Sequence, residues 1–155
     1  MNTKWIIAGV LLLILLGGGT VIYNQTRGLR NNNPGNIRKS GTKWQGEIPG
    51  DDPDFVTFIT PELGIRALGV LIRNYQRLYK LSTIRDIISR YAPPSENDTE
   101  SYINAVSRDM NIDADQDISL ESPAILSGFV QAIIRHENGL QPYNVATIDK
   151  GISLA

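Results

Sequence analysis

The spacing of apolar residues predicts that most of the chain after residue 60 is helical. Hydrophobic side chains recur every three or four positions in four stretches: from Pro61 to about Lys80, from Ser82 or Thr83 to Pro93, from Asn97 to Met110, and from Pro123 to Asn138. Ser, Thr or Asn stands at the start of each stretch or directly before it, as is typical of helix starts. We therefore predict four amphipathic helices.

The stretch before these helices follows another pattern. Residues 36–61 are interrupted by Gly and Pro, and residues 55–59 (FVTFI) are rich in residues that favour strands. We expect a small, irregular β-lobe here. The predicted fold class is α+β, a mostly helical domain with a small β-lobe.

The first residues are apolar throughout. Residues 5–23 carry no charge and have Trp5 and Tyr23 at their ends, and a helix of this length would span roughly 28 Å, close to the thickness of a bilayer core. We expect one uncleaved transmembrane helix; the alternative is a signal peptide cleaved near Gly17–Gly19. The predicted organisation is an anchor at 1–23, a linker at 24–30, one domain at 31–146 and a tail at 147–155.

The amino-acid composition excludes several classes of function and of site. The net charge of −1 over 155 residues is too balanced for a protein that binds nucleic acid through phosphate contacts. The absence of cysteine excludes disulfides, zinc–thiolate sites and a thiol nucleophile. Asp113, Asp115 and Asp117 imitate the start of a calcium loop, but the required Gly and Glu are missing. We expect no metal and no cofactor.

Glu137 occupies an unusual position in the last predicted helix. It continues the apolar stripe formed by Leu126, Phe129, Val130, Ile133 and Ile134. It also lies in the last turn, at the negative end of the helix dipole. Both circumstances favour the protonated carboxyl, so we predict a raised pKa, as a general acid requires. The alternative is a helix end that turns to solvent, with Glu137 paired to a cation.

A turn rich in asparagine supplies candidate binding residues. Four asparagines fall within residues 31–36 (NNNPGN), and such side chains either stabilise turns or bind sugar hydroxyls. Aromatic rings elsewhere could stack on sugar faces. The candidate substrate-binding residues are Asn32, Asn33, Asn36, Trp44, Tyr75, Tyr102 and Tyr143.

The strings RGLRNNNPGNIR, WQGE, FVTF, PELGIRAL and AIIRHENGLQPYN resemble a family of phage virion proteins with a lysozyme-like domain, over about residues 27–144. This resemblance implies a lysozyme-like fold, peptidoglycan glycan strands as substrate and other virion proteins as partners. It implies a location in the virion membrane or host inner membrane, with the domain facing the periplasm or virion interior. Positive residues flanking the apolar segment slightly favour the opposite orientation.

A looser similarity concerns flagellar-type glucosaminidases. Their Asn-rich turn, Trp-x-Gly lobe and following helix occur here in the same order, but the helix that ends in the catalytic Glu comes last instead of first. This order resembles a circular permutation, and it implies that Glu137 is the catalytic acid for the MurNAc–GlcNAc bond.

Two questions stay open at this stage. A lytic transglycosylase needs Glu137 alone, whereas a hydrolase needs a second carboxylate. The candidates are Glu47 and Asp52, with Asp51 and Asp54 nearby. We favour the transglycosylase. The alternative function is a non-catalytic structural membrane protein that keeps the lysozyme-like fold.

Overall fold

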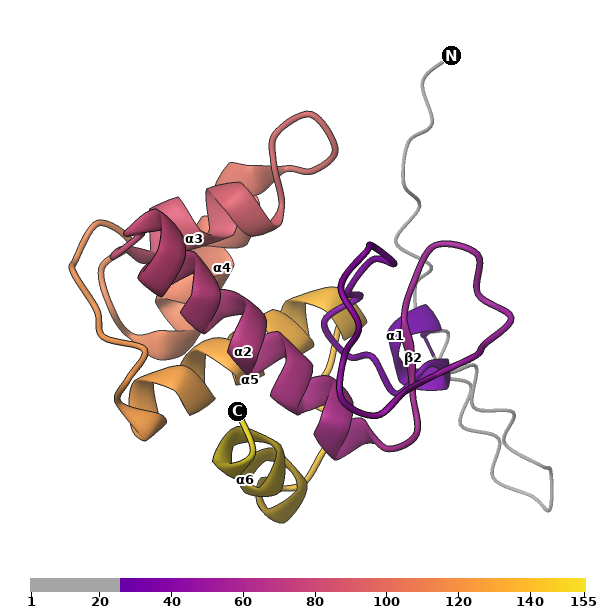
Figure 1. Cartoon of the computed structure of the whole chain (residues 1–155). Helices are drawn as coiled ribbons and strands as arrows, with labels where there is room; N and C mark the ends of the chain where they lie inside the picture. Colours follow the sequence, from indigo (N-terminus) through magenta and orange to yellow (C-terminus); the bar gives the residue numbers. More distant parts are fainter. Residues whose placement is uncertain (1–25) are drawn as a thin grey trace, which may run out of the picture.

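Helix α2 (Pro61–Tyr79) is the element around which the other described residues are arranged. It begins after an extended Thr60, has Pro61 in its first turn, and ends at Lys80, which adopts a left-handed conformation with φ of 59°. It contacts α3, α5, α6 and β2. In Figure 1, α2 runs through the middle of the molecule, with α3 and α4 towards one end and α1 and β2 towards the other. This computed structural model describes residues 26–155.

The other elements complete a mostly helical architecture. In chain order they are α1 (Arg27–Arg30), β1 (Glu47–Ile48), β2 (Thr57–Phe58), α3 (Ile84–Tyr91), α4 (Thr99–Met110), α5 (Pro123–Asn138) and α6 (Val145–Ser153). The strands pair antiparallel, with Glu47 opposite Phe58, and a bridge between Arg38 and Phe55 extends the lobe. The predicted small, irregular β-lobe is thereby confirmed.

Side-chain caps fix the starts of the shorter helices. Thr83 accepts a hydrogen bond from the backbone N–H of Asp86, as the predicted start of α3 requires. For α4 the prediction was one residue early. Asp98, and not Asn97, caps the helix by accepting from the N–H of Ser101.

The apolar stripes of α2 and α5 meet in the core. Leu68 and Ile72 of α2 and Phe129 and Ile133 of α5 are fully buried. The stripe of α2 was predicted to continue to its last residues, but Leu78 and Tyr79 are largely exposed. The end of α2 extends beyond the packed helices, so its periodicity continues where no core covers it.

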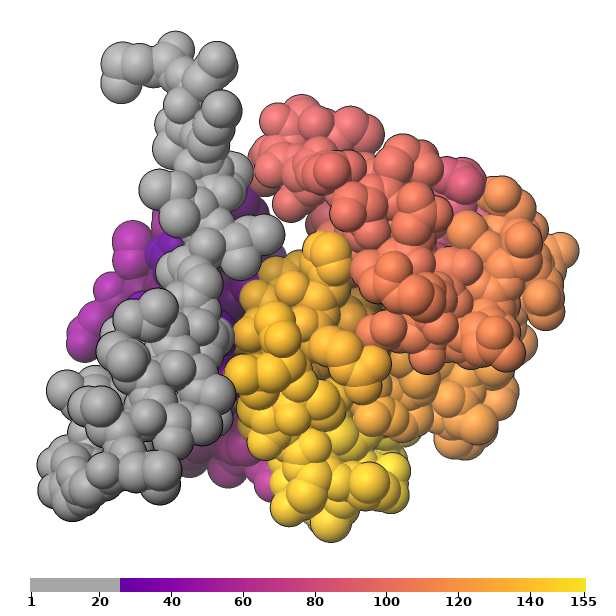
Figure 2. Space-filling model, turned by 180° about the vertical axis from the view of Figure 1, so that it is seen from behind, coloured from indigo at the N-terminus to yellow at the C-terminus, as the bar shows by residue number. Residues whose placement is uncertain are grey.

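Two segments predicted outside the domain belong to it. Residues 27–30, predicted as linker, form α1, which contacts α5. Residues 147–155, predicted as a tail, lie mostly in α6, which packs on α2 and α5 through buried Ile148 and Ile152. Figure 2 shows the yellow residues of α6 continuous with those at the end of α5. The domain therefore extends to the last residues of the chain.

The predicted fold class requires one correction. The transmembrane helix was predicted at residues 1–23, which lie outside the described residues. Within residues 26–155 no helix is long and apolar enough to cross a membrane. The longest, α2, has 19 residues, and Arg66, Arg73 and Arg77 interrupt its apolar sequence. Residues 26–155 thus form a mostly helical domain with a two-stranded sheet.

Gly64 allows the first turns of α2 to approach the asparagine-rich turn (residues 31–36). A Cβ at this position would lie 1.9 Å from the backbone carbonyl oxygen of Asn32 and 3.0 Å from the ring of Pro34. Backbone atoms cannot rotate away as a side chain can. Only glycine therefore permits this packing of helix against turn.

We expect Gly64→Ala to lower the free energy of unfolding by about 3 kcal/mol, because either the turn or the helix must shift. The matched control is Gly128→Ala in α5, where a Cβ would have only Met110 Cε in contact, at 3.8 Å. This control should be neutral or should stabilise by about 0.5–1 kcal/mol through helix propensity. Urea unfolding of the full-length variants measures both free energies of unfolding. If Gly64→Ala were as stable as Gly128→Ala, the interpretation that Gly64 permits the close approach would be contradicted.

Candidate functional site

The asparagine-rich turn is built largely by its own side chains. Asn33 is fully buried, and its amide donates to the carbonyl oxygens of Ile37 (2.9 Å) and Val56 (2.8 Å). Asn32 adopts φ of 49° and donates to the carbonyl of Phe58 at 2.9 Å. Both amides are engaged with the backbone, so two of the predicted substrate-binding residues have structural roles.

Asn138, the last residue of α5, attaches this turn to the helix. Its buried amide donates to the carbonyl oxygens of Pro34 (2.8 Å) and Ile134 (2.9 Å). Its Oδ1 accepts from the hydroxyl of Thr26 at 2.5 Å. In the sequence, Asn138 marked only the predicted end of the last helix. Adjacent residues of a helix do not share a face, so no local pattern in the sequence indicated this contact.

Glu137 lies at the contact between α5, α4 and the turn. Asn36 Nδ2 donates to Glu137 Oε2 at 2.7 Å, and the Tyr102 hydroxyl donates to Oε1 at 2.8 Å. The side chain is partly buried. Neither donor is a cation, so the carboxylate has neutral hydrogen-bond partners in place of the ion pair that the alternative interpretation required.

The protonation of Glu137 depends on two opposing effects. Burial raises its pKa above the ordinary glutamate value, while the hydrogen bonds from Asn36 and Tyr102 act in the opposite direction because they stabilise the ionised form. Burial is the larger effect, which confirms the predicted direction. The carboxyl therefore holds its proton at a higher pH than an exposed glutamate does.

Aromatic side chains surround the carboxyl on the side of α3 and α4. The ring of Tyr102 stacks on His136, with centroids 3.6 Å apart, and meets Tyr91 edge-on at 6.2 Å. Burial and the nearby Glu137 raise the pKa of Tyr102 well above its usual value, so its hydroxyl remains a donor. Tyr91 donates to the carbonyl of Gly35 in the turn. Tyr91 was not among the predicted binding residues.

The other three predicted aromatic residues have different environments. Trp44 packs partly buried against the core, and its indole Nε1 is buried without a hydrogen-bond partner. Tyr75 lies beside Tyr79 and under Arg90. Burial and the charge of Glu62 raise the pKa of Tyr143 to about 12. Only Tyr102 and Asn36, among the predicted binding residues, contact Glu137.

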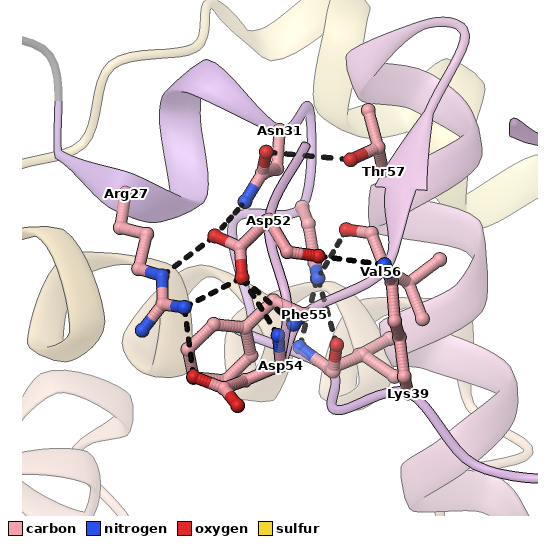
Figure 3. A network of polar contacts seen from close by, with 10 residues as sticks. Arg27, Asn31, Lys39, Asp52, Asp54, Phe55, Val56 and Thr57 are labelled. Carbon is pink, nitrogen blue, oxygen red and sulfur yellow. Dashed lines mark hydrogen bonds and ion pairs between the residues drawn. The ribbon is translucent and has the colours of Figure 1, made fainter. Parts of the chain in front are cut away.

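Asp52 is held in the polar network that Figure 3 shows. It accepts from Arg27 Nε and Nη2, each at 2.6 Å, from Asn31 at 2.8 Å, and from the backbone N–H groups of Asp54 and Phe55 at 3.0 Å. The Arg27 guanidinium above all holds the pKa of Asp52 far below its usual range. Asp52 is therefore an ionised anchor that joins α1 to the β-lobe.

Glu47 has a similar local role. It accepts from the backbone N–H of Trp44 and from Lys43 Nζ, both at 3.1 Å, and its pKa is lowered mainly by the Trp44 hydrogen bond. Neither second-carboxylate candidate contacts Glu137. Within residues 26–155, no group of three or more metal-ligating side chains is placed to hold an ion.

Two grooves in the described part of the molecule lie away from Glu137. One, of about 700 Å³, runs beside α5 and α6 past Arg73, Gln131 and Asp149. The other, of about 510 Å³, lies between α1 and the β-lobe and includes Arg30, Asp51 and Thr57. Glu137 contributes to neither lining.

The chain is similar to a phage protein. No family model matches the chain. The chain is 45% identical over 137 residues to Protein P5 of Pseudoalteromonas phage PM2, in a match that covers 85% of this chain and 83% of that protein. The name of the relative describes no activity.

We expect Asp52→Asn to lower the free energy of unfolding at pH 7 by about 2 kcal/mol, because a charged hydrogen-bonded partner of Arg27 is lost. The pKa of Asp52 is lower in the folded than in the unfolded protein, so ionised Asp52 stabilises the fold at pH values above its unfolded-state pKa. This stabilisation is lost as the pH falls towards the folded-state pKa. The difference between wild type and variant should therefore shrink below about pH 4.

The neighbouring, exposed Asp51 supplies the matched control. Asp51→Asn should change the stability by less than about 0.5 kcal/mol at either pH. Chemical denaturation at pH 7 and pH 3 measures these values. An Asp52→Asn variant as stable as Asp51→Asn at pH 7 would show that the anchor is dispensable.

Proposed function

The chain belongs to the family of Protein P5 of Pseudoalteromonas phage PM2, and on this premise we propose that it is a virion-associated enzyme that cleaves peptidoglycan glycan strands with Glu137 as its general acid. The observation that carries the proposal is the environment of Glu137. Its carboxyl has two neutral donors, Asn36 and Tyr102, and burial raises its pKa. A phage must open the host wall locally during entry or release, which gives such an acid a use.

The acid step follows from this environment. A protonated Glu137 would transfer its proton to the glycosidic oxygen between MurNAc and GlcNAc while the bond from that oxygen to MurNAc C1 breaks. The resulting carboxylate is then stabilised by the Asn36 amide and the Tyr102 hydroxyl, which already donate to it. The same contacts therefore suit the ionised form that the step produces.

The engagement of Glu47 and Asp52 favours a transglycosylase. In that reaction the MurNAc C6 hydroxyl attacks C1, and its proton passes to the Glu137 carboxylate. A 1,6-anhydro ring forms, no water is consumed, and Glu137 regains its proton. One carboxyl group is enough for both steps, whereas a hydrolase would need a second carboxylate. Asp52 already accepts five hydrogen bonds within the scaffold.

A non-catalytic role in the phage particle is the second candidate. Both oxygens of Glu137 have partners within the protein, and neither groove described above includes this residue. In that case Glu137 would serve only to join α5, α4 and the turn, and the domain would bind the wall or neighbouring phage proteins.

Glu137→Gln distinguishes the two functions. The amide keeps the size of the side chain but cannot act as an acid, so clearing of purified peptidoglycan by the full-length protein should fall by about 10²- to 10⁴-fold. Glu47→Gln and Asp52→Asn, assayed below their unfolding temperatures, should retain activity. Mass spectrometry of the products should show 1,6-anhydro ends.

Three results would count against this proposal. A wild-type protein that is inert on several wall types, or a fully active Glu137→Gln variant, would contradict the enzyme. Reducing ends in place of anhydro ends would contradict the transglycosylase and leave a hydrolase.

The Tyr102 hydroxyl should set the upper pH limit of activity. A general acid must start protonated, so activity falls as the pH rises through the pKa of Glu137. Tyr102→Phe removes a donor to the carboxylate, which raises that pKa further. We expect the falling limb of the pH profile of kcat/KM to move upwards by about one to two units.

Tyr91→Phe is the matched control for this shift. Its hydroxyl donates to the Gly35 carbonyl and not to Glu137. The pH limb of this variant should stay at the wild-type position. Coincident profiles for Tyr102→Phe and wild type would mean that the Tyr102 hydrogen bond does not control the protonation of the acid.

A further inference from the structure

Only the NH₂ group of the Asn36 side-chain amide is engaged in a hydrogen bond, while its oxygen is not. Its Nδ2 donates to Glu137 Oε2 at 2.7 Å, but its Oδ1 is buried and has no hydrogen-bond partner. An unsatisfied buried acceptor costs about 1–3 kcal/mol. Asn36 also adopts φ of 49°, which asparagine tolerates better than most residues. A costly arrangement is therefore maintained beside the proposed acid.

Asn36 Oδ1 borders the space beside Gly28 together with two other oxygen acceptors. It lies 2.8 Å from the position that a Cβ of Gly28 would occupy. The carbonyl oxygen of Asn33 and Oδ1 of Asn138 lie 2.8 Å and 3.1 Å from the same point. Each of these oxygens has one donor, from Asn36 N and Thr26 Oγ1 respectively, and each has a second lone pair. An NH₂ group would suit this location better than a third oxygen does.

A protonated Glu137 would in turn need an acceptor in place of one of its present donors. Both of its neighbours donate, which suits a carboxylate, but a protonated carboxyl carries an O–H that needs an acceptor. Reversal of the Asn36 amide would place its oxygen towards Glu137 and its NH₂ towards the space beside Gly28, which the Asn33 carbonyl oxygen and Asn138 Oδ1 also border. One rotation of the amide would therefore satisfy both groups.

We propose that Asn36 is a two-state positioning residue, whose side-chain amide donates to Glu137 when Glu137 is ionised and reverses to accept its proton when Glu137 is protonated. Each orientation supplies the hydrogen bond that one protonation state needs. The carboxyl is held in the same place in both states. The importance of this device for catalysis rests on the proposed function, but the reversal itself does not.

Among the described titratable groups near Glu137, the Tyr102 hydroxyl is the one hydrogen-bonded to it, and its oxygen could also accept the Glu137 proton, so the test must report the orientation of the Asn36 amide itself. Tyr102 from α4 donates to Oε1, and Tyr91 from α3 donates to Gly35. Burial raises the pKa of both tyrosines, so they stay neutral through the relevant range. His136 on α5 stacks on Tyr102, and burial lowers its pKa. Because His136 also titrates, the test must separate its effect from that of Glu137.

Nuclear magnetic resonance of the isotope-labelled full-length protein tests the reversal. The ¹³Cδ shift of Glu137 gives its pKa. Nuclear Overhauser contacts of the Asn36 Nδ2 protons give the orientation of the amide. Above the pKa these protons should contact the Hγ atoms of Glu137, and below it they should contact Hα of Gly28. The two changes should share one midpoint.

Two internal controls sharpen this measurement. The amide of Asn33, which donates to two backbone carbonyls, should not respond to pH. In Glu137→Gln the Asn36 contacts should become independent of pH, whereas a response caused by His136 would persist. A persistent response, or Asn36 contacts that stay with Glu137 while it titrates, would overturn the proposal.

A pair of variants gives an independent result. Asn36→Gly fits the positive φ and removes both the donor and the acceptor, so the pKa of Glu137 should change by less than about half a unit. Tyr102→Phe removes a donor and should raise that pKa clearly. Equal upward shifts would show that Asn36 is only a donor, whatever the enzymatic activity of the protein.

Discussion

The attachment of the asparagine-rich turn to the end of α5 is the constraint on which the site depends. Asn138 forms this attachment by donating a hydrogen bond to the Pro34 carbonyl, more than one hundred residues away in the sequence. The close approach of the turn requires glycine at positions 28 and 64, since a Cβ at either position would collide with oxygens of the turn. Without this contact Asn36 would not reach Glu137, and the raised pKa of the carboxyl would lose one of the surfaces that bury it.

Much of the helical framework was predictable from the sequence because local signals specify it. Proline and a preceding Thr or Ser mark the starts of α2 and α5, and Gly139 in a left-handed conformation ends α5. The stripe of α5 also located Glu137 correctly at the buried edge. These features depend on neighbours within a few positions, which a single sequence displays.

The features that could not be predicted from the sequence depend on contacts between residues far apart in the chain. Residue type does not distinguish Asn33, a buried scaffold residue, from Asn36, which donates to Glu137, since both are asparagines of the same turn. Asp52 resembled a loop acid until Arg27 was placed beside it. The segment at 147–155 resembled a tail because its few apolar residues are meaningful only against α2.

Asp52 and Glu137 show how the same functional group acquires opposite properties in one small domain. Both carboxyls lose water on folding, but Asp52 gains a guanidinium and two backbone N–H donors, and these outweigh the loss and lower its pKa. Glu137 gains only an amide and a phenol, which do not outweigh it. A scaffold needs a carboxylate that never changes its charge, whereas an acid needs one that can. The hydrogen-bond partners of Glu137 are neutral, and this supports the proposed acid role, since a purely structural tie at this position would be stronger with an arginine in place of Tyr102.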